Sequence, residues 1–293
     1  MSDFLKYQAL GNDYLIVDPG STDLVPTPAL VRLLCDRHYG IGSDGVLFGP
    51  VGPVASAEPI GLRIFNPDGG ECERSGNGLR IFGLYLAEHY LKDDEFTVRT
   101  PAGDARVEIL DAEAGLIKVD MGRPCFEADQ VPVEGLSGPA VGWSLALGDR
   151  TFTVTSVNVG NPHTVVPLPQ VGAELARDLG PRIARHPRFP HGTNVQFLQV
   201  IERTRIRIEI WERGAGYTLA SGSSSCAAAA AARALDLVDD EVEVQMPGGS
   251  LRISFDPAGS IQLTGTAEPV AGGWFAPGFR ARLLAAGRTG AAG

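Results

Sequence analysis

Two serines, each followed by glycine, have the residue types and setting to organise chemistry on a small anion. Ser75-Gly76 precedes a strongly apolar segment, and Ser221-Gly222 precedes a run of six alanines. Each pair predicts a helix that begins at a small-residue turn. A helix start presents about four unpartnered backbone N–H groups and roughly half a positive charge, and glycine lets a carboxylate or phosphate approach closely. We therefore predict an anion site at each turn.

Each serine alone has a simpler explanation, because serine is a preferred N-cap residue. The recurrence of the turn, each time before an apolar or small-residue helix, instead predicts two similar halves that face each other across a cleft. In that arrangement Ser75 and Ser221 lie beside the bound anion. The helix starts that would contribute binding groups are Gly76 and Asn77 in the first half, and Gly222 and Ser223 in the second.

Asparagines recur at predicted strand ends and turns, where a binding cleft would form. They are Asn12, Asn66, Asn161 and Asn194. Asparagine is common in turns for local reasons, so any one of them could be only a turn residue. Together with Glu212-Arg213 they form a plausible cage for a zwitterionic ligand, because arginine pairs with a carboxylate, glutamate with an ammonium, and asparagine with either.

His163 is the best candidate for an assisting general base, since it follows Asn161-Pro162 at a predicted strand end; its alternative is a structural loop histidine. Neither serine lies in a G-x-S-x-G elbow, so an esterase triad is not indicated. The glycine-rich residues 40–45 lack a following Lys-Ser/Thr and are a weak nucleotide signal.

Composition limits the class of protein. A chain of 293 residues is long enough for two domains, and a formal net charge of −10 argues against a nucleic-acid-binding surface. No 18-residue apolar run indicates a membrane span, and the N-terminus lacks the pattern of a signal peptide, so we expect a cytoplasmic protein. The four cysteines have no metal-ligand spacing and do not resemble a disulfide framework.

The pattern of strands around each Ser-Gly helix predicts an α+β fold with weak internal duplication. We expect strands at 4–8, 14–17, 62–65, 96–99, 105–110, 116–121, 151–159, 194–200, 204–211, 242–245, 251–255 and 261–264, with further helices at 28–37 and 173–185. Residues 50–59 are expected to form a loop. The domain boundary is placed near 122, giving domains 1–122 and 123–270.

The chain resembles the diaminopimelate epimerase family, the cofactor-independent racemases and epimerases of amino acids, over nearly its whole length. The motifs that carry the resemblance are Tyr7-Gln8-Ala9-Leu10-Gly11-Asn12-Asp13-Tyr14, Gly40-Ile41-Gly42-Ser43-Asp44-Gly45, Asn66-Pro67-Asp68-Gly69, Ser75-Gly76-Asn77-Gly78, Gly160-Asn161-Pro162-His163, Asn194-Val195, Glu212-Arg213-Gly214, Met246-Pro247-Gly248-Gly249 and Thr264-Gly265-Thr266-Ala267.

The resemblance implies two pseudo-symmetric domains, each a β-sheet or barrel wrapped around a central helix, with the active site between them. It also implies that residues 271–293 return to the first domain. The implied activity is inversion of the α-carbon of an amino acid, LL- to meso-diaminopimelate in lysine biosynthesis or a relative of it. No metal or organic cofactor is implied, and a homodimer is compatible with the sequence.

In the family, a thiolate removes the α-proton from one face and the opposite thiol reprotonates the other. By resemblance, Asn66, Asn161, Asn194 and Arg213 match residues that hold the distal group of the substrate. His163 and Glu212 match side chains near the acid–base pair and the substrate ammonium.

The sequence departs from the family at the acid–base pair itself, because Ser75 and Ser221 stand where the family has its two catalytic cysteines. A cysteine thiol titrates near 8.5, whereas a serine hydroxyl is a far weaker acid and needs an adjacent base. Cys72 and Cys226 do not fall at the two catalytic positions. Three hypotheses follow: an epimerase with a re-tuned serine pair, a same-fold lyase or double-bond isomerase, and an amino-acid-binding protein without turnover.

Overall fold

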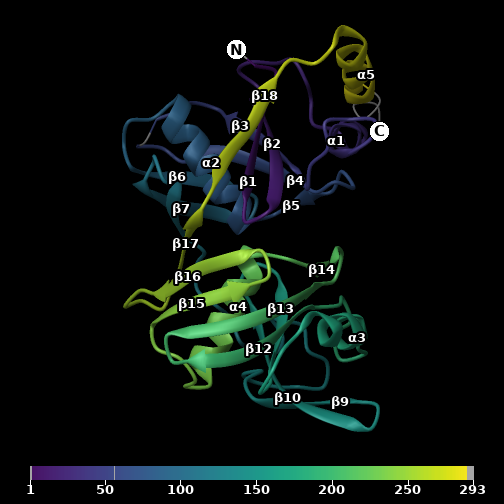
Figure 1. The fold of residues 1–293 in the computed structure, drawn as a ribbon, viewed down its shortest axis with the longest axis vertical. Coiled ribbons are helices and arrows are strands. Elements are labelled where there is room, and N and C mark those ends of the chain that lie inside the picture. Colours follow the sequence, from purple (N-terminus) through teal and green to yellow (C-terminus); the bar gives the residue numbers. More distant parts are fainter. Residues whose placement is uncertain (1, 56, 289–293) are drawn as a thin grey trace. The chain divides into compact units, whose positions relative to one another are not determined.

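The computed structural model describes residues 2–55 and 57–288, and the chain forms two compact units. Unit 1 contains the residues up to Val119 together with those from Thr266 onward, and unit 2 contains Asp120–Gly265. Figure 1 labels the elements of both units. Each unit is described by itself below.

Unit 1 is a mixed sheet with three helices. Its strands are β1 (Phe4–Ala9), β2 (Asn12–Val17), β3 (Val46–Val51), β4 (Ile60–Phe65), β5 (Glu71–Cys72), β6 (Glu95–Thr100), β7 (Gly103–Asp111), β8 (Leu116–Asp120) and β18 (Glu268–Gly273). Its helices are α1 (Pro28–Cys35), α2 (Gly76–His89) and α5 (Pro277–Arg288). The last strand, β18, pairs antiparallel with β1, so the end of the chain completes the sheet of the N-terminal residues.

Unit 2 is a second mixed sheet with two helices. Its strands are β9 (Trp143–Leu147), β10 (Arg150–Asn158), β11 (Pro162–Pro167), β12 (Asn194–Glu202), β13 (Arg205–Glu212), β14 (Gly216–Thr218), β15 (Glu241–Met246), β16 (Gly249–Phe255) and β17 (Ile261–Thr266). Its helices are α3 (Ala173–Ala184) and α4 (Gly222–Ala234).

The strand pairings of the two units repeat. In unit 1 the hairpin β1–β2 is followed by the parallel pair β2–β3, the antiparallel pairs β3–β4 and β4–β5, the parallel pair β4–β6 and the antiparallel pairs β6–β7 and β7–β8. In unit 2 the strands β10 to β17 pair in the same sequence of orientations. Helices α1 and α3 cross between the first parallel strands, and α2 and α4 between the second. The predicted α+β class and duplication are confirmed.

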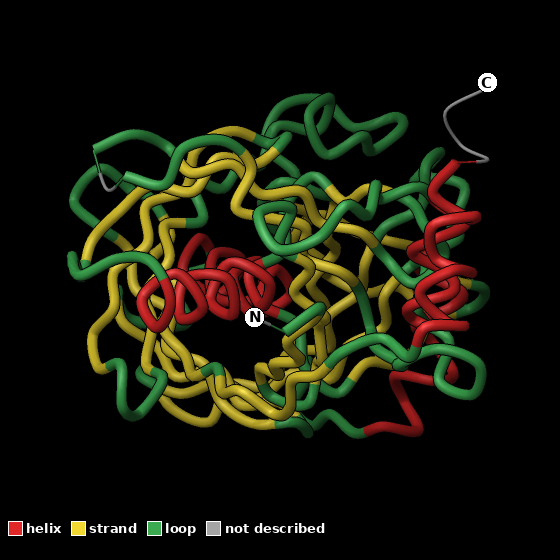
Figure 2. Tube along the Cα trace, turned by 90° about the horizontal axis from the view of Figure 1, so that it is seen from above, coloured by secondary structure: helices red, strands yellow, loops and turns green. Residues whose placement is uncertain are grey.

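Helices α2 and α4 form the centres of their units, and helix turns surrounded by strands are visible in Figure 2. Every residue of α2 from Gly76 to Leu86 is buried, so this helix is enclosed on all sides instead of presenting one apolar stripe. In α4 the alanines Ala227–Ala232 are at most 2% exposed. Alanine favours helix and lets neighbouring strands approach closely, which explains how a sheet can wrap around this helix. The predicted burial of the alanine helix is confirmed.

Most predicted elements are present, and the errors have physical causes. The apolar segment predicted after Ser75-Gly76 is helical only as far as His89, where α2 ends, and Tyr90 beyond it is 45% exposed. The predicted loop 50–59 begins too early, because β3 continues to Val51. The elements that were not predicted are strands β3, β5, β9, β11, β14 and β18 and helix α5. In β18, residues Glu268–Ala271 are exposed and lack the apolar alternation on which strand prediction depends.

Candidate active site

Ser75 caps the central helix of unit 1. Its Oγ accepts the N–H of Gly78 at 3.0 Å, and the hydroxyl of Tyr14, from β2, lies 3.3 Å from the same oxygen. A Cβ at position 78 would be crowded, because it would lie 3.3 Å from Ser75 Oγ and 3.0 Å from the Leu47 side chain, and these side chains would have to shift. Ser75 satisfies the Gly78 N–H, so Gly76 and Asn77 are the remaining first-turn residues whose N–H groups have no acceptor one turn earlier in the helix.

The predicted ligand-binding side chains of Asn12 and Asn77 bind each other. Asn77 Nδ2 donates to Asn12 Oδ1 at 2.9 Å, and Asn12 Nδ2 donates to the Asp44 carboxylate at 3.0 Å. Asn77 Oδ1 accepts from the Arg80 guanidinium at 2.8 Å. Both amide groups are thus engaged within unit 1, and their role in the site is to fix the turn; the ligand donors that remain are backbone N–H groups.

Ser221 caps α4 in the same way. Its Oγ accepts the N–H of Ser224 at 3.4 Å and lies 3.4 Å from Ser223 Oγ. The Ser221 N–H points at the sulfur of Met246, 3.5 Å away. Ser221 and Gly222 are buried, whereas Ser223 is half-buried. The N-cap function that serine predicts is therefore present at both turns.

Unit 2 places Asn161, His163 and Asn194 together through one strand pairing. His163 and Asn194 face each other in the parallel ladder of β11 and β12, and His163 Nε2 lies 2.7 Å from Asn161 Oδ1. Asn194 Oδ1 accepts the backbone N–H of Arg213 at 3.0 Å, while its Nδ2 donates to the Pro162 carbonyl at 3.2 Å. These residues, predicted from separate motifs, form one connected group.

His163 is fully buried and is held as a neutral imidazole. Burial is the main cause that lowers its pKa to about 3, and the charge of Arg213 acts in the same direction. Gln196 Nε2 lies 3.0 Å from His163 Nδ1 and also donates to Ser224 Oγ at 3.0 Å. The imidazole is therefore joined to the first turn of α4 through Gln196.

Glu212 is the last residue of β13 and directly precedes Arg213. Its carboxyl group interacts with Ser221. Burial raises the pKa of the Glu212 carboxyl, and hydrogen bonding from Ser221 opposes that rise. A carboxylate whose pKa is raised is a stronger base than an ordinary carboxylate, which suits it to accept a proton. Arg213 is exposed, and its guanidinium donates to the His191 carbonyl at 2.9 Å.

Within unit 1, Asn66 differs from Asn12 and Asn77 in its surroundings. It lies at the turn between β4 and β5, and its side chain is exposed. Its backbone N–H donates to the Gly70 carbonyl, which closes the turn. Within residues 2–55 and 57–288, no hydrogen bond joins its side chain to Asn12 or Asn77.

Comparison with known proteins identifies the family to which this arrangement belongs. The family model described as diaminopimelate epimerase matches residues 4–127 and 155–270. The chain belongs to the diaminopimelate epimerase family. It is thereby an isomerase of the epimerase class.

Curated relatives match over nearly the full chain. Diaminopimelate epimerase 2 of Nostoc sp. strain PCC 7120 is 44% identical, with 92% of this chain and 94% of that protein covered. The diaminopimelate epimerase of Desulforudis audaxviator is 41% identical, with 92% and 97% covered. Among solved structures, a hydroxyproline epimerase from Agrobacterium vitis shares the fold with a TM-score of 0.65 at 16% identity, covering 92% of this chain and 90% of its own.

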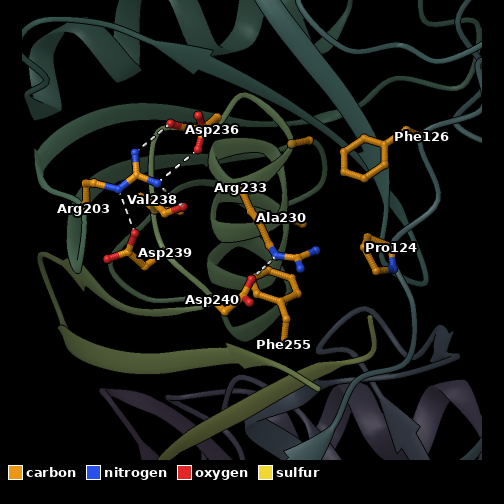
Figure 3. A pocket seen from close by; sticks show the side chains of 11 residues that line it. Pro124, Phe126, Arg203, Ala230, Arg233, Asp236, Val238, Asp239, Asp240 and Phe255 are labelled. Carbon is orange, nitrogen blue, oxygen red and sulfur yellow. Dashed lines mark hydrogen bonds and ion pairs between the residues drawn. The ribbon is translucent and has the colours of Figure 1, made fainter. Parts of the chain in front are cut away.

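Ser221, at the N-terminal end of α4, lies at the opposite end of this helix from a hollow in unit 2. That hollow, of about 520 Å³, is at the C-terminal end of α4 (Figure 3). Its arginines are neutralised locally, since Arg203 pairs with Asp239 at 2.7 Å and Arg233 with Asp240 at 2.6 Å. Helix α4 has 13 residues, so its two ends are about 20 Å apart. A helix C-terminus carries partial negative charge, which disfavours a carboxylate ligand.

Four residues of this epimerase-family site were missed by sequence reasoning: Tyr14, Arg80, Gln196 and Ser224. Arg80 and Gln196 each offered a signal, because a charged or amide side chain inside an otherwise apolar segment must find partners if it is buried. Tyr14 and Ser224 offered none, since a tyrosine in a strand and a serine in a first helical turn are ordinary. Among the described residues, no helix is long and apolar enough to cross a bilayer.

Proposed function

We propose that this protein is a diaminopimelate epimerase that inverts one α-carbon, LL- to meso-diaminopimelate, in lysine biosynthesis. The observation that carries the proposal is the repeated turn: in each unit a serine caps the central helix, whose first-turn N–H groups have no acceptor one turn earlier in the helix. Curated relatives of up to 44% identity, named diaminopimelate epimerase, support the choice of substrate.

Each unit would contribute the serine that acts on one face of the substrate α-carbon. Ser75 would act on one face of the α-carbon and Ser221 on the other, while the N–H groups of Gly76, Asn77, Gly222 and Ser223 hold the α-carboxylate. Charge supports this arrangement, since two helix N-termini favour a carboxylate and the enolate-like charge that develops beside it as the proton leaves.

The distal end of the substrate would bind at Asn66, Asn161, Asn194 and Arg213. The exposed Arg213 guanidinium has donors available for a distal carboxylate. Asn161 and Asn194 each already make at least one side-chain hydrogen bond within unit 2. Only their remaining donor and acceptor positions can bind the substrate.

Because serine stands at both acid–base positions, proton transfer depends on the groups that lie beside each serine. A serine hydroxyl needs an adjacent base, and Glu212, next to Ser221, is such a base in unit 2. We propose that Glu212 receives the proton through Ser221, and that neutral His163 positions Asn161 instead of taking a proton itself. On the unit 1 side Tyr14 is the polar group next to Ser75. This asymmetry leads us to expect turnover well below that of a cysteine pair.

The direct test is turnover of LL-diaminopimelate, followed by chromatographic separation of the LL and meso isomers. The purified protein should produce meso isomer, and Ser75→Ala together with Ser221→Ala should abolish production. A matched control is Ser254→Ala, a serine on β16 that lies outside both turns. No isomerisation by the unmodified protein at any pH from 6 to 9 would contradict an epimerase.

Two other functions would give different results with diaminopimelate and related acids. A lyase or double-bond isomerase would consume a related unsaturated or hydroxylated acid without inverting diaminopimelate. An amino-acid-binding protein would bind diaminopimelate tightly in calorimetry and leave it unchanged. We further infer that the protein is cytoplasmic, takes a small amino acid as its partner and binds no nucleic acid; a homodimer would be detected by sedimentation.

A further inference from the structure

A second hollow in unit 2 is lined by two arginines. It has a volume of about 330 Å³, at the lower end of the range for small-molecule sites. Arg185, His191 and Arg213 form its polar wall, and Phe189 and Pro190 contribute apolar surface. Among the described residues, no aspartate or glutamate lines it. The hollow is therefore suited to an anionic group.

Local packing directs the Arg213 side chain along this hollow. Gly192 has a φ of +70°, and a Cβ there would lie 3.7 Å from Arg213 Cδ and 3.9 Å from Arg213 Cβ, so the arginine stem lies over this glycine. The guanidinium donates to the His191 carbonyl at 2.9 Å. That bond uses one of five N–H donors, so the group is held in one direction while most of its donors remain for another acceptor.

The two arginines of this hollow lack carboxylate partners. Within residues 2–55 and 57–288, neither Arg185 nor Arg213 forms an ion pair. In the hollow at the end of α4, by contrast, Arg203 pairs with Asp239. One unpaired arginine at a surface is ordinary, but two on one concave surface raise the local concentration of anions. The charge in this hollow is thus available to a ligand.

The C-terminal end of helix α3 lies beside the hollow, and its partial negative charge opposes an anion. The last carbonyl groups of this helix are occupied, because Ile183 accepts the Arg185 N–H and Ala184 accepts the Thr193 N–H at 3.1 Å. A helix end carries roughly half a charge, whereas the two guanidiniums carry a full charge each. The net field in the hollow therefore favours a carboxylate.

The hollow is adjacent in sequence to the groups proposed for proton transfer. Glu212 and Arg213 are consecutive, yet the Glu212 carboxyl interacts with Ser221 while the Arg213 side chain lines the hollow. Neighbouring residues can thus contact the two ends of one small ligand. Such a ligand has a second anionic group a few bonds away from its reacting carbon.

We infer that Arg185 is a specificity-determining residue of the proposed epimerase, and that with Arg213 it holds the distal carboxylate of the substrate in this hollow. Two guanidiniums around one carboxylate form charge-assisted hydrogen bonds that an amino acid with a single carboxylate cannot form. The hollow therefore selects diaminopimelate over lysine, which differs from it by that one carboxylate. The inference rests on the proposed function for the identity of the substrate.

The test measures equilibrium binding of meso-diaminopimelate and of L-lysine by calorimetry. The protein carries Ser75→Ala and Ser221→Ala, so that the ligand is not converted, and it should bind diaminopimelate more tightly than lysine. Adding Arg185→Gln should weaken diaminopimelate binding about tenfold, the loss expected for one charge-assisted interaction, with lysine binding unchanged. Arg185→Lys should fall between, since lysine keeps the charge but loses the planar fork.

The matched control is Arg182→Gln, which removes a charge from the same helix but outside the hollow, where Arg182 pairs with Asp178. It should leave both affinities unchanged. The inference is overturned if both ligands bind equally before the change at position 185, if Arg185→Gln weakens both ligands or neither, or if Arg182→Gln has the same effect.

Binding and turnover are measured separately, so the two proposals can fail independently. Selective binding that depends on Arg185, without isomerisation by the unmodified protein, would contradict the proposed function alone. Isomerisation together with an unchanged ratio of the two affinities in Arg185→Gln would contradict this inference alone.

Discussion

Gln196 and His163 lie side by side in the interior of unit 2, with Gln196 Nε2 3.0 Å from His163 Nδ1. The amide donates, so Nδ1 is the acceptor and the imidazole proton resides on Nε2, where it meets Asn161 Oδ1. One buried amide therefore sets the tautomer of the histidine and, through it, the orientation of Asn161. Gln196 Oε1, by contrast, is buried without a hydrogen-bond partner among the described residues.

Gln196→Leu should disturb this tautomer. The change leaves His163 Nδ1 and Ser224 Oγ without their donor, and an unsatisfied buried group costs about 1–3 kcal/mol of the free energy of unfolding. Nitrogen-15 NMR of the imidazole should show a mixture of tautomers in place of the Nε2-protonated form. A single unchanged tautomer in Gln196→Leu would contradict the assignment.

Acid should destabilise the protein through His163. The pKa of His163 is about 3 in the folded state and about 6.5 in the unfolded chain, so the unfolded state binds more protons between these values. The contribution of His163 to the free energy of unfolding is fully present above about pH 6.5. Below that pH it falls by up to about 1.4 kcal/mol per pH unit. Urea unfolding at pH 7.5, 6 and 5 measures the slope.

The control for that slope is His163→Gln, which keeps a side-chain amide but cannot gain a proton. Its free energy of unfolding should be lower at pH 7.5 but should change less between pH 7.5 and 5. His186, at the surface of unit 2, provides the matched comparison, and His186→Gln should retain the full slope. Equal slopes in His163→Gln and the unmodified protein would show that other groups cause the acid loss.

Ser221→Ala should raise the pKa of Glu212 further. Hydrogen bonding from the Ser221 hydroxyl stabilises the carboxylate form, so its removal favours the protonated form and leaves only hydrogen bonding from Thr218 to oppose the effect of burial on the pKa. Carbon-13 NMR of the Glu212 carboxyl follows the titration without needing activity. Ser223→Ala, on the same turn, should leave the titration nearly unchanged. A lower pKa in Ser221→Ala would be inconsistent with the proposed pairing.

Close packing around α4 predicts a steep cost for added volume. Ala229 is 0% exposed, so Ala229→Leu has no space to fill and should lower the free energy of unfolding by about 1–3 kcal/mol or more. Ala234, exposed at the end of the same helix, is the matched control, and Ala234→Leu should change stability by less than about 0.5 kcal/mol. Similar losses in the two variants would argue against a helix enclosed by strands.

The sequence predicted where elements lie better than how side chains are used. Strands such as β13 alternate apolar and polar residues, and the Ser-Gly turns indicate where α2 and α4 begin. These strands and helices could therefore be predicted directly. The full enclosure of α2 could not be inferred, because arginine is almost never fully buried unless it is paired and the partners of Arg80 are not evident from the sequence. Its partners, the turn residues and the Thr266 carbonyl, come together only in the folded unit.

The asparagines illustrate the same limit. Their positions at strand ends indicated a binding site, but residue type does not say whether an amide faces a ligand or another amide. Asn12 and Asn77 are bonded to each other, whereas Asn66 is exposed. The difference depends on Asp44 and Arg80, which are 32 and 3 positions away from their asparagine partners. Such pairings are set by tertiary structure.

The central claim is that this family member inverts an α-carbon with serines at both acid–base positions. The most direct measurement is proton NMR of meso- and LL-diaminopimelate in D2O with the unmodified protein, Ser75→Ala, Ser221→Ala and a variant with cysteine at both positions. We predict slow loss of the α-proton signal with the unmodified protein, none with the alanine variants and faster loss with the double-cysteine variant. Silence of the unmodified protein would contradict the account, whether or not the double-cysteine variant exchanges the α-proton.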